Sequence, residues 1–228
     1  MQRFGLFWEA IGREMTVSDL AALRRMRQVG SFLRLIARLD VGAAATTSSR
    51  PVLHAANHRS LLDLLFAAAA FAHWGQPIRC LVAASYFQKP GLGKLLRDLR
   101  CVPVNGRAAL NVAQDLLLAG TSVAIMPEGR VVPPEDWNEN RVGRPHSGVG
   151  RLAIDTGVAV AVAGAAGTEI LWPKDRSWPQ VRLWSNRTLL TMRTRYLGPI
   201  DARHARDATF EIWDAVSECV AEAELARA

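Results

Sequence analysis

The chain has 228 residues, half of them apolar and 21% charged, and its formal net charge is +7 at pH 7. This length suits one domain, or one domain with a short appendage, and the composition excludes an intrinsically disordered chain. The three cysteines, Cys80, Cys101 and Cys219, form no CxxC pair. We therefore expect a protein of a reducing compartment, and neither a disulfide-stapled secreted module nor a zinc knuckle.

Arginine supplies most of the positive charge, because only three of the 28 basic residues are lysines. This usage is typical of a GC-rich genome, so the size of the net charge alone says little about partners. A positive field still favours phosphate groups, nucleic acid or an anionic membrane surface. The positions of the arginines along the chain are therefore needed to distinguish between these partners.

Residues 1–40 are expected to form a helical segment. No acidic residue lies between Arg24 and Arg38. One side of the helical wheel carries Arg24, Arg27, Arg34 and Arg38, and the opposite side carries Met26, Val29, Phe32, Leu33, Ile36 and Leu39. Such a basic amphipathic helix has two interpretations: its apolar side packs on the protein core, or it lies in the headgroup region of an anionic membrane.

No apolar stretch reaches the about 20 residues that a bilayer span needs. The longest, residues 64–72 and 156–168, suit buried core elements. A short apolar patch at the N-terminus is interrupted by Glu9, Arg13 and Glu14, and it lacks the features of a signal peptide. We therefore expect a soluble or peripheral protein, not an integral membrane protein.

A small, polar and unperiodic stretch, residues 42–51, predicts a linker. It divides the chain into an N-terminal segment, residues 1–50 with the linker included, and a main domain, residues 51–228. Strands are expected over residues 52–56, 78–83, 122–126, 158–164 and 189–196, and helices over residues 61–73, 107–119, 149–156 and 210–226. This alternation predicts an α/β domain with a central sheet flanked by helices.

The stretch NHRSLLD, residues 57–63, follows the first expected strand of the main domain. Histidine is suited to proton transfer near neutral pH, and a carboxylate bound to one ring nitrogen leaves the other as a base. Residues five apart on a helix point about 140° apart, so His58 and Asp63 meet only if His58 precedes the helix. Ser60 is a suitable N-cap with Asp63 at its N3 position. The alternative is that Asp63 only caps the helix and His58 is an ordinary loop histidine.

Two further stretches combine arginines with strand ends. Arg107 follows a short strand and opens a helix, where a guanidinium can bind phosphate, or is simply a surface arginine. Glu128, Gly129 and Arg130 follow the strand 122–126 in a turn at the end where α/β sheets bind ligands. They either orient a substrate or form a solvated ion pair. No P-loop, GxGxxG motif or metal-ligand spacing is present.

Taken together and in this order, these motifs resemble the glycerolipid acyltransferase family, which comprises 1-acylglycerol-3-phosphate acyltransferases and related lysophospholipid acyltransferases. NHRSLLD matches the family's NHxSxxD motif. The other resembling stretches are KPGLGKLLRDLRCVPVNGR (89–107), IMPEGR (125–130), HSGVGRLAIDTGVAVAVAGAAGT (146–168) and RTRYLGPI (193–200). The resemblance covers about residues 50–202 and implies an α/β fold with a single mixed sheet.

The resemblance also implies a mechanism and residue roles. His58 would deprotonate an acceptor hydroxyl that attacks an acyl thioester, and Asp63 would orient His58 and stabilise its imidazolium. Arg107 would bind the acceptor's phosphate, while Glu128, Gly129 and Arg130 would position the acceptor. Asn57 and Ser60 would shape the turn. The co-substrate would be acyl-CoA or acyl-carrier protein, with no metal and no other cofactor.

Two departures from the family pattern leave the acceptor open. The third motif lacks the Thr or Ser that usually stands between Gly129 and Arg130, and Ala159 and Val162 stand where the fourth motif has prolines. The leading expectation is acylation of 1-acyl-sn-glycerol-3-phosphate. The alternative is another acceptor, such as a glycolipid, a lyso-aminolipid or a natural-product hydroxyl.

The membrane-derived substrates of such enzymes favour the interfacial interpretation of the N-terminal helix. We therefore expect a cytoplasmic protein that lies peripherally on the inner, anionic face of the cell membrane. A non-catalytic lipid- or nucleic-acid-binding module would explain the arginines but not the ordered motifs. The chain also lacks the interleaved aromatics of nucleic-acid binders, so no nucleic-acid partner is expected.

Overall fold

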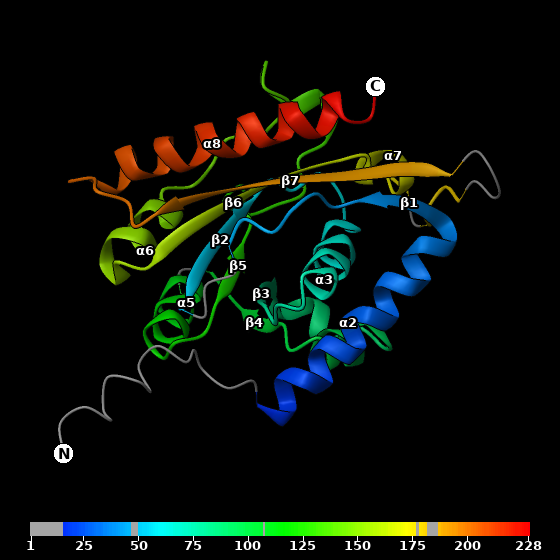
Figure 1. The fold of residues 1–228 in the computed structure, drawn as a ribbon, viewed down its shortest axis with the longest axis horizontal. Helices are drawn as coiled ribbons and strands as arrows, with labels where there is room; N and C mark the ends of the chain where they lie inside the picture. The colour runs from blue at the N-terminus through cyan, green and yellow to red at the C-terminus, as the bar shows by residue number, and fades with distance from the viewer. Residues whose placement is uncertain (1–15, 47–49, 107, 177, 182–186) are drawn as a thin grey trace.

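The computed structural model describes residues 16–46, 50–106, 108–176, 178–181 and 187–228. Its centre is a seven-stranded sheet with the strand order β1-β7-β6-β2-β5-β3-β4 (Figure 1). The strands are β1 (Ala37–Asp40), β2 (Val52–Ala56), β3 (Arg79–Ala83), β4 (Val102–Val104), β5 (Val123–Ile125), β6 (Ala159–Ala166) and β7 (Thr188–Gly198). Neighbouring strands pair in parallel except β6 and β7, which are antiparallel, so the expected single mixed sheet is confirmed.

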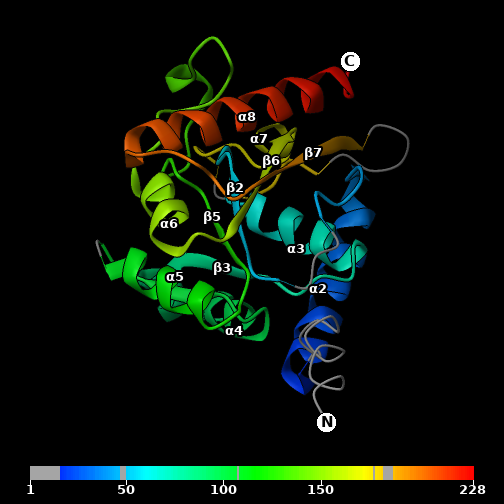
Figure 2. The ribbon, with the colours of Figure 1, turned by 60° about the vertical axis from the view of Figure 1, so that its left-hand side comes forward.

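Helices cover both faces of this sheet. They are α2 (Val17–Ile36), α3 (Asp63–His73), α4 (Leu92–Asp98), α5 (Ala108–Leu118), α6 (Gly148–Thr156), α7 (Thr168–Leu171) and α8 (Ala205–Leu225). Side chains of α5, α6 and α8 share one apolar core with β2, β5 and β6. Those of α2, α3 and α4 contribute to apolar cores on the other side, where α2 lies beside α3 (Figures 1 and 2).

The N-terminal segment is part of the sheet. Helix α2 begins with a capping box. The Asp19 N–H donates to the Thr16 side chain, and the Thr16 N–H donates to the Asp19 side chain. The helix ends at Ile36, and the chain continues as β1, which pairs with β7. The expectation of helix through residue 40 is therefore wrong for its last four residues. The domain boundary at residue 50 stays a prediction.

Most other elements match the expectation within a few residues. The weak alternation over residues 189–196 corresponds to the eleven-residue strand β7. Helix α8 begins at Ala205, earlier than expected, and lies very close to β6. A Cβ atom on Gly164 would lie 2.1 Å from the backbone nitrogen of Val220, so only glycine permits this approach. Among the described residues, no helix combines the length and apolarity needed to cross a bilayer.

Candidate active site

The stretch NHRSLLD leaves the sheet at the carboxyl end of β2, between β5 and β6. Asn57 is buried, and its side-chain amide makes two hydrogen bonds to the backbone of Ala165 in β6. Asn57 Nδ2 donates to the Ala165 carbonyl at 2.9 Å, and the Ala165 N–H donates to Asn57 Oδ1 at 2.8 Å. The amide thus acts like one more peptide group of the sheet and fixes the point where the turn starts.

The side chain of Asp63 is hydrogen-bonded to several polar groups of this turn. It is the first residue of α3 and is 3% exposed. Its Oδ2 atom lies 2.9 Å from Nδ1 of His58 and accepts the backbone N–H groups of Arg59 and Ser60 at 2.7 and 2.8 Å. Three donors therefore converge on one oxygen of this carboxyl group. The predicted meeting of His58 and Asp63 is therefore present in the structure.

This contact determines the chemistry that His58 can perform. A carboxylate can only accept, so a neutral imidazole bound to it carries its proton on Nδ1. Nε2 then keeps its lone pair and can remove a proton, while Asp63 stabilises the imidazolium that forms. The side chain of His58 is partly exposed, as a base that meets a substrate must be.

The predicted capping role of Ser60 is only partly correct. Helix α3 begins at Asp63, with Leu62 at the cap position and no side-chain capping bond. The Ser60 N–H donates to Asp63, which is one half of a capping box. The other half is missing, because Ser60 Oγ accepts from the Leu62 N–H and donates to the Trp172 carbonyl. Ser60 therefore holds the turn against the chain after α7.

Thr168 is a site residue that was not predicted. Its Oγ1 donates to Asp63 Oδ1 at 2.5 Å, and the residue is fully buried at the start of α7. This bond fixes the oxygen of Asp63 that does not contact His58. The sequence signal that could have identified Thr168 is the Gly-Thr pair at the end of the fourth motif.

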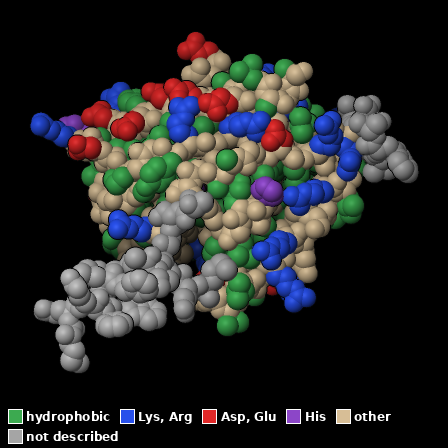
Figure 3. All heavy atoms as spheres, viewed as in Figure 1, with side chains coloured by type: hydrophobic (Ala, Val, Ile, Leu, Met, Phe, Trp, Pro, Cys, Tyr) green, Lys and Arg blue, Asp and Glu red, His purple; other side chains and the backbone are tan. Residues whose placement is uncertain are grey.

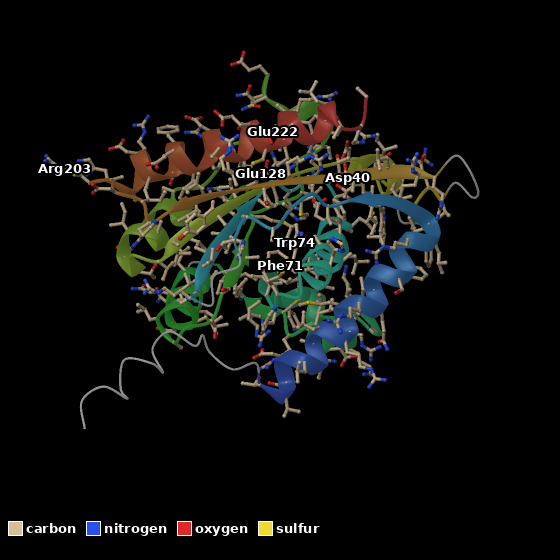
Figure 4. The ribbon with its side chains drawn as sticks, in the orientation of Figure 1. Asp40, Phe71, Trp74, Glu128, Arg203 and Glu222 are labelled. Atoms are coloured by element: carbon tan, nitrogen blue, oxygen red, sulfur yellow. The ribbon has the colours of Figure 1, made fainter. Side chains whose placement is uncertain are left out.

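Glu128 is buried beside the turn, with 4% of its surface exposed. Its Oε2 accepts the backbone N–H of His58, and its Oε1 accepts that of Gly143 at 2.6 Å. Burial raises the pKa of Glu128 to about 7, although both hydrogen bonds act to lower it. In Figure 4, Glu128 lies near the sheet, above Phe71 of α3 and Trp74, which follows that helix. The Glu128 side chain thus contacts the backbone of His58.

The two residues after Glu128 behave differently. Gly129 has a φ of +68°, and a side chain there would meet the ring of His146 at 3.2 Å. Arg130 is exposed and pairs with Asp136 at 2.8 Å. A solvated ion pair, one of the two sequence interpretations, is therefore formed by Arg130, but with Asp136 and not with Glu128. No described contact brings Arg130 to His58.

Arg107 lies outside the described residues. The elements on either side of it match the prediction, because β4 ends at Val104 and α5 begins at Ala108. The buried Arg59 was not predicted as a site residue. Its side chain leaves the turn beside His58 and is 1% exposed.

Comparisons with known proteins agree with this fold. A sequence model of the family described as Acyltransferase matches residues 38–163. The crystal structure of the 1-acyl-sn-glycerophosphate (LPA) acyltransferase PlsC from Thermotoga maritima shares the fold, with a TM-score of 0.73 and 21% identity over 96% of this chain and 87% of that one. No curated protein sequence matches at a significant level. The family match spans more than half of the chain and contains the His58–Asp63 turn, so this protein belongs to the Acyltransferase family and is an acyltransferase.

Proposed function

We propose that the protein transfers a fatty acyl group from acyl-CoA or acyl-carrier protein to a hydroxyl group of a lysophospholipid, with 1-acyl-sn-glycerol-3-phosphate as the acceptor. The observation that carries this proposal is the contact of His58 Nδ1 with Asp63 at 2.9 Å, at the carboxyl end of β2 and within the family's ordered motifs. The thioester is already activated, so a positioned base and proximity suffice for transfer.

The proposed reaction is a single displacement at the thioester carbonyl. His58 Nε2 removes the proton of the acceptor hydroxyl as its oxygen attacks the carbonyl carbon. The new C–O bond forms and the C–S bond breaks, so that the thiolate leaves and takes the proton from the imidazolium. Asp63 stabilises that imidazolium while it lasts. No covalent acyl-enzyme and no metal are required.

The acceptor side of the site rests on the family resemblance and on the positions of the motifs. Arg107 stands just before α5, where a guanidinium and a helix N-terminus can bind a phosphate together. Gly129 permits the positive φ that this turn needs, and Arg130 can reach an anion if its exposed pair with Asp136 opens. Glu128 contributes through the turn that it holds, because backbone N–H groups occupy both of its oxygens.

The test is an acceptor screen with one long-chain acyl-CoA. We expect thiol release and phosphatidate formation with lysophosphatidate, and slower turnover with monoacylglycerol, which lacks the phosphate. Arg107→Ala should raise KM for lysophosphatidate and leave KM for monoacylglycerol unchanged. Turnover with a glycolipid or a lyso-aminolipid but not with lysophosphatidate would establish the alternative acceptor class. No thioester turnover with any acceptor would refute the proposal.

We also propose that the outer face of α2 binds an anionic membrane, on the inner face of the cell membrane. The structure leaves room for both interpretations of this helix. Met26, Val29 and Leu33 are buried in the protein, whereas Phe32 and Leu35 are 58% and 68% exposed. The arginines of the segment, Arg24, Arg27, Arg34 and Arg38, are exposed as well. The only acidic residue of the helix, Asp19, is buried against Arg79.

This mixture of exposed arginine and bulky apolar side chains without free carboxylates is the composition of an interfacial helix. Figure 3 shows blue and green side chains next to one another at the lower right, over α2. A hollow on this helix is lined by Leu20, Ala21, Arg24, Arg25 and Gln28, which offers both charge and apolar contact to a lipid headgroup.

Charge reversal on α2 is the expected way to release the protein from vesicles. Arg24→Glu with Arg34→Glu should lower binding to phosphatidylglycerol vesicles by at least about tenfold, because each basic side chain near such a surface contributes about 1 kcal/mol. The measurement is co-sedimentation at two salt concentrations. A matched control, Arg203→Glu with Arg206→Glu, changes the same charge at the start of α8. Equal loss in both variants, or in neither, would contradict a specific role of α2.

A further inference from the structure

Arg59 carries a charge into the protein interior. It follows His58 directly, and its side chain is one of the largest that are fully buried. Its Nη1 pairs with Glu224 at 2.5 Å and lies 3.6 Å from Glu169, and its Nη2 donates to the Arg141 carbonyl at 2.8 Å. The guanidinium also stacks 4.2 Å from the ring of Trp137. We call these five residues the Arg59 network.

The partners of Arg59 come from three separate parts of the chain. Glu224 lies in the last turn of α8, Glu169 lies in α7, and Trp137 and Arg141 belong to the segment that follows the third motif. Although burial acts to raise it, the pKa of Glu224 is lowered, by Arg59 first and then by Arg141 and Arg227. Glu224 is therefore ionised opposite Arg59. The network joins the catalytic turn to α7, to α8 and to that segment.

The segment held by Arg59 also holds the backbone of His58. The Val132 N–H donates to the His58 carbonyl at 2.8 Å. Glu128, at the beginning of this segment, accepts the His58 N–H, and its other oxygen accepts the Gly143 N–H near the end of it. Both backbone groups of the base are thus bonded to a segment whose middle is fixed by Arg59 through Trp137 and Arg141.

Stability alone does not account for this arrangement. Taking a guanidinium and a carboxylate out of water has a desolvation cost that offsets most of their attraction. One nitrogen of the guanidinium, Nε, is buried without a hydrogen-bond partner among the described residues. Apolar side chains of similar size would fill this space at least as well, but they would not fix directions. The effect of the network is therefore geometric.

We propose that Arg59 is a positioning residue for acyl transfer: by holding the segment between Glu128 and Gly143 against α7 and α8, it fixes the backbone of His58 and so the direction of its ring. The inference rests on the proposed role of His58 as the base. Arg59 itself touches no substrate in this scheme. A displacement of the base by about 1 Å is enough to cost about a hundredfold in rate.

The decisive variant is Arg59→Met combined with Glu224→Met. It removes both charges of the closest pair, so it should fold even if Arg59→Met alone does not; burial already raises the pKa of Glu169, which can take up a proton when Arg59 is gone. We expect kcat to fall by at least about tenfold, with KM for the donor and the acceptor changed by less than about twofold, as for a misplaced base. The control is Arg151→Ala, which removes an exposed arginine paired with Asp155 on α6. It should match the wild type.

Hydrogen exchange gives a readout that does not depend on turnover. The amide protons of His58, Val132 and Gly143 should exchange faster in the double variant than in the wild type and in Arg151→Ala. Unchanged exchange at these amides, an unchanged kcat, or a loss confined to KM for the acceptor would each overturn the positioning role. If exchange increases but the wild-type protein transfers no acyl group, the proposed function fails and the structural coupling stands.

Discussion

Replacing His58 with alanine is expected to reduce kcat by about 10³-fold, with little effect on the free energy of unfolding. The imidazole is the only described group in the turn that can take a proton from the acceptor, and a positioned general base contributes about 10²–10⁴-fold. The side chain is partly exposed, and its hydrogen bond among the described residues is to Asp63, so its removal should leave no large cavity. The measurement is steady-state thiol release with saturating acyl-CoA and acceptor.

The matched control for this variant is His73→Ala. His73 is an exposed histidine in the last turn of α3, and its removal should leave kcat unchanged. His54 is a poorer control, because it is half-buried against Phe71, where desolvation lowers its pKa to about 4. A folded His58→Ala protein that keeps the wild-type rate would exclude the proposed mechanism.

Asp63→Asn separates the two roles of the carboxylate. Asparagine has nearly the same shape but only one acceptor oxygen, while Asp63 accepts from His58, from the N–H groups of Arg59 and Ser60 and from Thr168. The variant should therefore lose both activity and stability, whereas His58→Ala loses activity alone. This difference in the two profiles is the signature of a carboxylate that both orients the base and fixes the turn.

The local part of the site could be predicted from the sequence. The carboxylate of Asp63 reaches His58 because both lie in one turn between a strand and a helix, and that geometry follows from five residues of spacing. The main strands and helices are likewise local patterns of apolar residues. The four-residue strand β1 carries too little pattern to be recognised, and its place in the sheet depends on β7, about 150 residues later.

The long-range part of the site could not be predicted in this way. Asn57 binds Ala165 across 108 residues, and Arg59 binds Glu224 across 165. Neither sequence separation corresponds to a helical or strand period, because these contacts form only through the order of the strands in the folded sheet. The backbone contacts of Glu128 were missed for the same reason: its sequence neighbours suggested a substrate contact, which stays a prediction, whereas its oxygens bind backbone groups of His58 and Gly143.

Glu128→Gln is expected to change both catalysis and the pH dependence of stability. A carboxylate accepts both N–H groups, whereas the amide of glutamine turns an NH₂ group toward one of them. We expect kcat to fall by about 10²-fold, because the backbone of His58 loses a fixed partner. KM for the acceptor should change much less. A rise in that KM with an unchanged kcat would instead make Glu128 a direct ligand of the acceptor.

The pH dependence follows from the pKa of Glu128, which burial raises from 4.5 to about 7. Between these values the folded protein binds a proton that the unfolded chain does not, so the contribution of Glu128 to stability is largest below about pH 4.5 and is lost as the pH rises through about 7. The loss is at most about 3 kcal/mol, since one pKa unit corresponds to about 1.4 kcal/mol. From pH 5 to pH 8, the free energy of unfolding measured with urea should therefore fall more in the wild type than in Glu128→Gln.

The control for this comparison is Glu135→Gln, in the same segment of the chain but exposed. It should follow the wild type at both pH values, because its side chain is exposed to solvent. If the free energy of unfolding changed equally with pH in the wild type and in Glu128→Gln, the Glu128 carboxylate would be ionised in the folded protein from pH 5 to pH 8. The hydrogen bonds from His58 and Gly143 would then outweigh burial, and Glu128 would hold the base equally well at pH 5 and at pH 8.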